Sequence, residues 1–233
     1  MPPFSVAAVA RAIDHAVLKP DATSADLARH AAMCVARGVG CLCVRPCDVA
    51  AAVRLTADSP VAVASVVGFP HGSHRPETKA LEARLAIADG ARELDMVMNV
   101  GGLLSGDRAG VRDDIAAVVA AARPHRGLVK VILETCFLTP EQIAAACRLA
   151  EEAGADFVKT STGFGTNPGG PTGATPEAVR IMLDAVGGRL GVKASGGIRT
   201  WDDAVAYLGM GCRRIGVSDA AAILDGGEIR TSY

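Results

Sequence analysis

Short apolar segments alternate with longer helical patterns along the whole chain. The apolar segments predict eight strands, at Ala12–Asp14, Val39–Val44, Val61–Val67, Leu94–Val100, Leu128–Glu134, Phe157–Thr160, Gly191–Ala194 and Arg214–Val217. The intervening segments predict helices near Ser24–Arg37, Pro46–Ala57, Pro76–Gly90, Arg108–Arg123, Pro140–Ala153, Pro176–Val186, Thr200–Met210 and Asp219–Leu224. Strands that alternate with helices form a parallel sheet with helices packed on its faces.

The number of these units predicts a closed barrel. Eight units in 233 residues average about 29 residues each, close to the roughly 30 residues of a strand–helix–strand unit. The chain has no dinucleotide-binding fingerprint and no linker-like stretch that would divide it. We therefore expect an α/β fold, a single-domain (β/α)8 TIM barrel over residues 1–233. The segment Gly163–Gly173 is rich in Gly, Pro and Thr, which predicts a loop over the barrel mouth.

Composition narrows the class of protein. Apolar residues make up 50% and charged residues 21%, which excludes a disordered chain or a coiled coil. The net charge of −1 gives no basic excess for nucleic acid or an anionic membrane. The apolar runs are too short to span a bilayer, and Arg11 interrupts the N-terminus early, so we expect no secretory signal. Seven cysteines, an odd number, favour a reducing, cytoplasmic location.

Alternation along the strands predicts which side chains point into the barrel. Leu94, Met96 and Met98 form a fully apolar face, which we assign to the surrounding helices. Asp95 lies on the opposite face and therefore points inward. The same alternation in the other strands places five ionisable side chains inside the barrel, namely Asp95, Lys130, Glu134, Lys159 and Lys193.

Buried charges are costly unless they are paired, and two interpretations follow. One is a structural salt-bridge network in which Lys130 meets Asp95 or Glu134. The other concerns Lys159 and Lys193, at the carboxyl ends of adjacent strands. A neighbouring cation and a dry site both disfavour a charged amine, so the pKa of one lysine should fall.

A lysine with a lowered pKa is a free-amine nucleophile, as Schiff-base chemistry with a carbonyl requires. Asp95 would then move protons as a general acid or base. The chain contains 19 Arg and only five Lys, and Arg cannot serve as such a nucleophile.

The loops after the seventh and eighth strands suggest an anion site. Gly196 and Gly197 follow the seventh strand, and Gly216 and Ser218 end the eighth. Barrel phosphate sites are commonly built from these two loops and a short helix N-terminus, although simple turn chemistry explains the same residues.

Cysteine and histidine residues give weaker signals. Cys41, Cys43 and Cys47 invite a metal interpretation, but no His follows at zinc-finger spacing, and buried thiols with no metal fit better. We expect His71 and His74 to face solvent. For His15 we expect a structural hydrogen bond.

Motifs that run almost from end to end resemble those of deoxyribose-phosphate aldolases, which are class I, Schiff-base aldolases on a (β/α)8 barrel. The matching segments are Ile13-Asp14-His15, Leu18-Lys19-Pro20, Cys43-Val44-x-Pro46, Val66-Val67-Gly68-Phe69-Pro70-x-Gly72, Glu93-Leu94-Asp95-Met96-Val97-x-Asn99, Lys130-Val131-Ile132-Leu133-Glu134-Thr135, Phe157-Val158-Lys159-Thr160-Ser161-Thr162-Gly163-Phe164 and Val192-Lys193-Ala194-x-Gly196-Gly197-Ile198-Arg199.

The resemblance implies reversible cleavage of 2-deoxy-D-ribose 5-phosphate to acetaldehyde and D-glyceraldehyde 3-phosphate. Lys159 matches the lysine that forms the Schiff base, Lys193 the second lysine, and Asp95 the acid/base aspartate. Tyr233 matches a C-terminal tyrosine that reaches the active site in some members. The residues implied to bind substrate or phosphate are Asp14, Cys43, Lys130, Thr160, Gly163, Gly196, Gly197, Gly216 and Ser218.

The resemblance also implies the setting of the reaction. It implies a role in deoxyribose phosphate catabolism, small aldehyde and sugar-phosphate substrates, and a homodimer or higher homo-oligomer. No metal or other cofactor is expected, because the iminium itself serves as the electron sink.

The chain departs from the family pattern at three places. Ala16 stands where the family usually has Thr, the Gly163–Gly173 loop looks longer, and Asp219 replaces a Ser in the phosphate loop. A carboxylate there would repel a phosphate dianion. Two alternatives therefore stay open: a Schiff-base aldolase for a different, unphosphorylated aldehyde pair, and a sugar-phosphate-binding barrel without catalysis.

Overall fold

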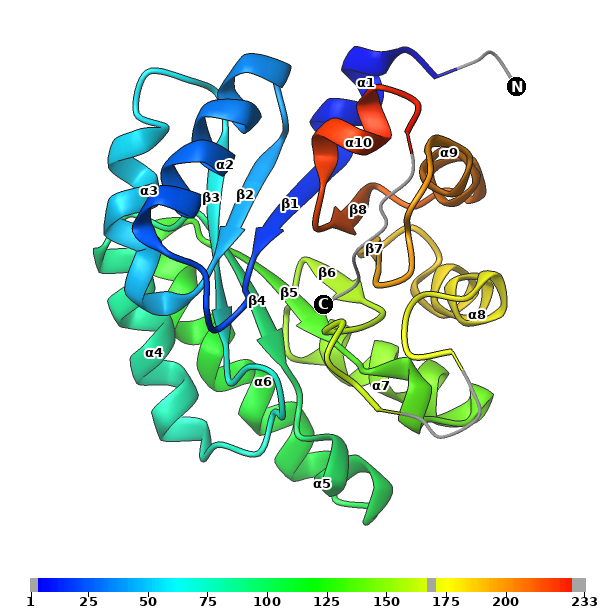
Figure 1. Ribbon diagram of the computed structural model, residues 1–233. Coiled ribbons are helices and arrows are strands. Elements are labelled where there is room, and N and C mark those ends of the chain that lie inside the picture. The colour runs from blue at the N-terminus through cyan, green and yellow to red at the C-terminus, as the bar shows by residue number, and fades with distance from the viewer. Residues whose placement is uncertain (1–3, 167–170, 228–233) are drawn as a thin grey trace.

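Eight parallel strands close into one barrel in the computed structural model, which describes residues 4–166 and 171–227. Each strand pairs with its neighbours in chain order, and β8 closes the barrel against β1 (Figure 1). The strands are β1 (Ile13–Val17), β2 (Cys41–Val44), β3 (Ala62–Val67), β4 (Glu93–Val97), β5 (Leu128–Ile132), β6 (Phe157–Lys159), β7 (Gly191–Ser195) and β8 (Arg214–Val217). The predicted TIM barrel is therefore confirmed.

Helices surround the barrel and follow the strands in turn (Figure 1). Thr139 and Thr200 each cap a helix through a reciprocal hydrogen-bond pair with the third helical residue, which explains where α7 and α9 begin. None of the helices in the described part of the chain is both long and apolar enough to cross a membrane. The helices are α1 (Val6–Ala12), α2 (Ser24–Arg37), α3 (Val49–Leu55), α4 (Pro76–Ala88), α5 (Val100–Leu104), α6 (Arg108–Ala122), α7 (Pro140–Glu152), α8 (Pro176–Val186), α9 (Trp201–Met210) and α10 (Ala220–Leu224).

Two predicted strands end two or three residues earlier than expected, and both ends have a local cause. The Leu94–Val100 prediction is wrong at its end, because the side chain of Asn99 accepts a hydrogen bond from the Gly102 N–H at 3.0 Å and starts α5. The Leu128–Glu134 prediction also runs too far, since Glu134 adopts a left-handed backbone conformation with φ 55°. Both corrections lie at the carboxyl ends of strands, where the chain turns outward around the barrel mouth.

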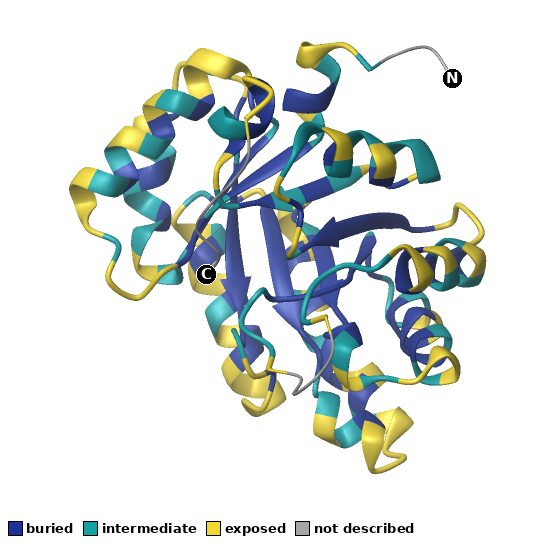
Figure 2. Ribbon diagram, turned by 45° about the vertical axis from the view of Figure 1, so that its right-hand side comes forward, coloured by how far each residue is buried: buried dark blue, intermediate teal, exposed yellow. Residues whose placement is uncertain are grey.

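The strand faces divide the interior into an apolar layer and a mixed barrel centre. Leu94, Met96 and Met98 pack with the helices in the main apolar core, as the alternation predicts. Figure 2 shows buried strands enclosed by helices whose outer faces are exposed. Inside the barrel, apolar side chains near β2 and β3 form a separate small cluster of Leu18, Cys41, Cys43, Ala64 and Val66. The charged side chains lie in the rest of the barrel centre.

A buried ion pair outside the barrel joins two helices to the end of a central strand. Lys79 of α4 donates hydrogen bonds to Asp114 of α6 at 2.6 Å and to the Val97 carbonyl at 2.9 Å. Both side chains are buried, so solvent screens this pair weakly. The contact fixes the carboxyl end of β4 close to the barrel mouth.

Removing the cation of this pair should destabilise the fold strongly. Lys79→Met leaves Asp114 as an uncompensated buried charge, which costs about 3 to 5 kcal/mol in comparable cases. Urea unfolding measures the loss. The matched control is Glu77→Ala on the same helix, whose ion pair with Arg75 is exposed and should contribute nothing measurable. Equal stabilities for the two variants would contradict this role.

Candidate active site

At the centre of the barrel, three lysines donate hydrogen bonds to one carboxylate, that of Asp95. Asp95 Oδ1 accepts a hydrogen bond from Lys130 Nζ at 2.9 Å. Asp95 Oδ2 accepts from Lys159 Nζ at 2.8 Å and from Lys193 Nζ at 2.7 Å. All four side chains are buried, and Lys159 and Lys193 pair directly across β6 and β7. The inward direction predicted for these residues from strand alternation is confirmed.

A second layer of charge lies beside this group. Asp14 of β1 accepts from Lys130 at 2.8 Å, Lys193 at 2.5 Å and Arg214 at 2.5 Å. Glu93 lies 2.7 Å from Arg214 and 2.5 Å from Lys130. Sequence reasoning missed Arg214 and did not use Glu93. The signal was present, because the apolar Ile215 and Val217 face outward and leave Arg214 facing inward.

The number of carboxylate partners separates the three lysines. Burial disfavours the charged form of each amine. Within the described residues, Lys159 forms an ion pair with one carboxylate, Asp95, so burial, reinforced by the repulsion of Lys193, lowers the pKa of its amine. Lys193 has two carboxylate partners, Asp14 and Asp95, which outweigh burial and raise its pKa. The pKa of Lys130 rises well above its ordinary value because three carboxylates surround it. Lys159 is thus the most readily deprotonated of the three.

The two aspartates stay ionised. Burial opposes their charge, but attraction to Lys130 and Lys193 outweighs burial and holds the pKa of both Asp14 and Asp95 below the ordinary value. Arg214 adds to this effect at Asp14. At neutral pH, Asp95 is therefore ionised and Lys193 is protonated.

A narrow cavity opens onto Lys159 and Lys193 from the barrel mouth. Gly216 is necessary here, because a Cβ at this position would lie 2.8 Å from the Ser195 Cβ and 3.2 Å from the Lys193 Cε. Lys159, which lines this cavity, is 4% exposed. The lining residues are Asp14, Ala16, Leu18, Cys43, Lys159, Thr162, Lys193, Ser195, Gly196 and Gly216.

Five residues implied to bind substrate or phosphate lie outside that lining, and one of them, Ser218, lines a different cavity. Lys130 is fully buried among carboxylates below the cavity. Thr160 is also buried, and it exchanges two hydrogen bonds of 3.0 Å with the Ser195 backbone. Gly163 and Gly197 both adopt left-handed conformations in the loops after β6 and β7. Tyr233 lies outside the described residues.

Glu134 does not meet Lys130, so one version of the predicted salt-bridge network is wrong. Its carboxylate instead accepts the Thr162 N–H at 3.1 Å and the Thr162 hydroxyl. The left-handed backbone of Glu134 turns the side chain toward the β6–α8 loop and away from the barrel centre. Burial raises the pKa of this carboxyl. Glu134 thereby holds the loop that carries Thr162 against the cavity.

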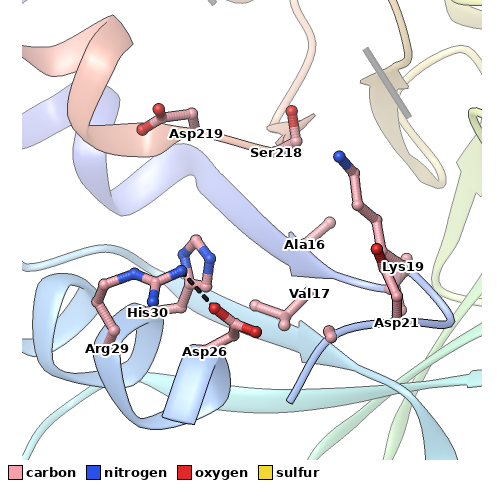
Figure 3. A pocket seen from close by; sticks show the side chains of 11 residues that line it. Ala16, Val17, Lys19, Asp21, Asp26, Arg29, His30, Ser218 and Asp219 are labelled. Carbon is pink, nitrogen blue, oxygen red and sulfur yellow. Dashed lines mark hydrogen bonds and ion pairs between the residues drawn. The ribbon is translucent and has the colours of Figure 1, made fainter. Parts of the chain in front are cut away.

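Ser218 and Asp219 line a separate cavity of about 320 Å³ together with Lys19, Arg29 and His30. Figure 3 shows Lys19 extending from the β1–α2 loop in the direction of Ser218. Asp219 caps α10 by accepting the Ala222 N–H at 3.1 Å. The Ala222 N–H, at the start of this short helix, is therefore already engaged by the Asp219 carboxylate.

His15 has the structural role expected of it. The Ala220 N–H donates to His15 Nδ1 at 3.2 Å, so the ring proton lies on Nε2 and is donated to His30 Nδ1 at 2.8 Å. Burial, with a contribution from His30, lowers the pKa of His15 to about 3 and keeps it neutral. The Ala220 N–H, a second donor at the start of α10, is therefore engaged by His15.

The predicted exposure of the two remaining histidines and the predicted burial of the clustered cysteines are confirmed, except at Cys47, whose thiol is exposed. His71 and His74 are exposed, and Cys41 and Cys43 are buried free thiols. Asp14, Cys41 and Glu93 place potential ligand atoms within 4.8 Å of one another. Lys130 and Arg214 already neutralise these carboxylates, and burial raises the pKa of the Cys41 thiol. Their chemistry therefore fits an ion-pair network better than a metal site.

Comparisons with known proteins agree on one family. The sequence model of the DeoC/LacD family of aldolases matches residues 8–218. A deoxyribose-phosphate aldolase from Mycobacterium avium is 51% identical over 224 residues, which cover 94% of this chain and 97% of the relative. One from Thermococcus gammatolerans is 48% identical over 220 residues, covering 94% and 96%. The tetrameric structure of deoxyribose phosphate aldolase from Aeropyrum pernix superposes with a TM-score of 0.87 at 34% identity, covering 95% of this chain and 91% of that one.

Removing the Lys193 charge should make the Lys159 amine harder to deprotonate. Lys193→Leu leaves Asp14 and Asp95 with one cation fewer, so the pKa of Lys159 should rise by on the order of one unit. The reactivity of this amine toward a small aldehyde should then increase only at higher pH. Lys193→Arg keeps the charge and is the control. A pH profile of Lys193→Leu that overlays the unmodified protein would contradict the electrostatic role.

Proposed function

The chain belongs to the DeoC/LacD family of aldolases, and from this premise we propose that it cleaves 2-deoxy-D-ribose 5-phosphate reversibly to acetaldehyde and D-glyceraldehyde 3-phosphate. It is a carbon–carbon lyase. The observation that carries the proposal is the position of Lys159, which pairs with a single carboxylate, Asp95, and lines a small cavity together with Lys193. An amine in this setting is the nucleophile that a class I aldolase needs.

The reaction begins with a covalent bond between Lys159 and the substrate. In the cleavage direction, the neutral amine adds to the C1 aldehyde of the open-chain sugar. The resulting hydroxyl group leaves as water after it takes a proton, and an iminium remains. Lys193 is placed to donate that proton, because its ammonium adjoins Lys159 and stays charged.

Cleavage follows from the electron demand of the iminium. A base removes the proton of the C3 hydroxyl, the C2–C3 bond breaks, and its electron pair forms an enamine with the iminium carbon. Glyceraldehyde 3-phosphate is thereby released. Protonation of the enamine at C2 and hydrolysis of the imine give acetaldehyde and restore the amine, so the water lost earlier is returned. The ionised Asp95 is the proton acceptor nearest Lys159.

The phosphate is assigned to the loops that follow β7 and β8. Gly196 and Gly197 adopt consecutive left-handed conformations, which turn backbone away from the strand and suit anion binding. Ser218 adds a hydroxyl from the neighbouring loop. The start of α10 is a poorer donor, because His15 and Asp219 already accept two of its N–H groups.

A second candidate substrate is an unphosphorylated aldehyde or sugar. Asp219 favours it, since a carboxylate beside Ser218 repels a dianion. A barrel that only binds sugar phosphates is disfavoured, because the chain is an aldolase by family and its charged residues are in contact.

We also propose a homo-oligomeric assembly and a cytoplasmic location. A homo-oligomer is supported by the tetrameric Aeropyrum pernix relative. A cytoplasmic location is supported by five cysteines that are buried as thiols in the apolar core or the barrel interior: Cys34, Cys41, Cys43, Cys147 and Cys212. Tyr233 is assigned to proton transfer at the substrate methyl carbon, by its resemblance to the C-terminal tyrosine of some relatives.

Lys159→Arg should abolish imine formation while it keeps a hydrogen-bond donor that Asp95 can bind. Guanidinium stays protonated and cannot attack an aldehyde. Borohydride reduction in the presence of acetaldehyde, followed by peptide mass spectrometry, should place an adduct on Lys159 of the unmodified protein. Lys79→Arg is the matched control, because Lys79 is buried outside the barrel. An adduct on Lys193 or Lys130 would overturn the assignment.

Asp219→Ser should strengthen binding of the phosphorylated substrate. Serine can also cap α10, so the helix should be retained. Loss of the exposed negative charge should lower KM for deoxyribose 5-phosphate by up to about tenfold at low salt, and by less at high salt. KM for unphosphorylated deoxyribose should not change. Equal effects on both substrates would show that Asp219 does not face the phosphate.

A further inference from the structure

We propose that Glu93 and Arg214 are positioning residues that set the charge balance of the barrel interior and so keep Lys159 neutral and reactive. The inference rests on the proposed role of Lys159 as the nucleophile. Neither Glu93 nor Arg214 lines the cavity above Lys159, so neither is placed to touch substrate there. Both act through the charged side chains between them and the reactive amine.

Contacts connect this pair to the catalytic group by two routes. Arg214 binds Asp14 Oδ1 at 2.5 Å, and the other oxygen of Asp14 binds Lys193 at 2.5 Å. Glu93 binds Lys130 at 2.5 Å, and Lys130 binds Asp95 at 2.9 Å. Both routes end on the two groups that face Lys159, which are Lys193 and Asp95. Arg214 Nη2 also donates a hydrogen bond to Glu93 Oε1 at 2.7 Å, so the two routes are connected to each other.

The charges of this interior balance only when Lys159 is neutral. Asp14, Glu93 and Asp95 supply three negative charges. Lys130, Lys193 and Arg214 supply three positive charges. Each of these cations contacts at least two of the three carboxylates, and Lys193 contacts both aspartates. A charged Lys159 would be a fourth cation. Because an uncompensated buried charge is costly, the balance favours the neutral amine.

The remaining groups around the interior do not offset this balance. Cys41 and Cys43 of β2 are thiols whose pKa values burial raises, so they stay neutral. β3 contributes the apolar Ala64 and Val66. Glu134, after β5, interacts weakly with the charge of Lys159, but its carboxylate is directed to Thr162, and burial, the largest effect on it, raises its pKa. Loss of either Glu93 or Arg214 alone would therefore change the net charge around Lys159.

Opposite changes at the two positions should move the Lys159 amine in opposite directions. Arg214→Met removes a cation and leaves a carboxylate in excess, so Lys159 should hold its proton to higher pH. Glu93→Gln removes an anion with little change in shape, so Lys159 should lose its proton at lower pH. The double variant restores the balance. A residue that only supports the fold would not produce shifts of opposite sign.

The test is the pH dependence of borohydride trapping of acetaldehyde on Lys159, measured for the full chain. Glu93→Gln should move the midpoint down, and Arg214→Met should move it up, each by on the order of one unit. The double variant should return toward the unmodified protein, and Arg214→Lys, which keeps the charge, should not shift. Thermal unfolding is recorded for every variant, and if Arg214→Met does not fold, Glu93→Gln and Arg214→Lys carry the test.

Two kinds of failure are distinguishable. If the unmodified protein forms no adduct on Lys159, the proposed function fails. If the adduct forms but Glu93→Gln leaves the midpoint in place or raises it, the charge-balance inference is overturned and the proposed function stands. Shifts of the same sign in both single variants would overturn it as well.

Discussion

The cost of burying charge is the constraint on which this site depends. A barrel interior is ordinarily filled by branched apolar side chains, which need no partners. Here Asp14, Glu93 and Asp95 are buried in the same space as three lysines and Arg214. Ionised groups persist there only because each is held by an oppositely charged neighbour. The group with the fewest partners is Lys159, so the same constraint that stabilises the network weakens the charge on one amine.

Packing around the barrel maintains the geometry that the charges require. The outward faces of the strands bury apolar side chains such as Met96 and Ile215 under the helices, which fixes the inward direction of the polar side chains. Gly216 leaves room for the Lys193 side chain, and Glu134 holds the loop that carries Thr162. Rigid strands thus position the reactive amine, whereas the loops shape the opening above it.

Much of the site follows from strand alternation in the sequence. The apolar outer face of β4 was enough to direct Asp95 inward, and similar patterns placed Lys159 and Lys193 beside each other. Alternation gives direction but no partner, so it could not distinguish Asp95 from Glu134 as the neighbour of Lys130. That choice depends on the left-handed turn at Glu134, which no local pattern signals. Short helices such as α5 escaped notice because one side-chain cap, at Asn99, starts them.

Direct observation of lysine ionisation tests the central claim, because the chain has only five lysines. Heteronuclear NMR of side-chain-labelled lysine would follow each amine through a pH titration, with assignments from single substitutions. We expect Lys159 to lose its proton below the ordinary lysine value of 10.5, while Lys130 and Lys193 stay protonated throughout. A Lys159 that titrates at or above that value, or together with Lys193, would contradict the account.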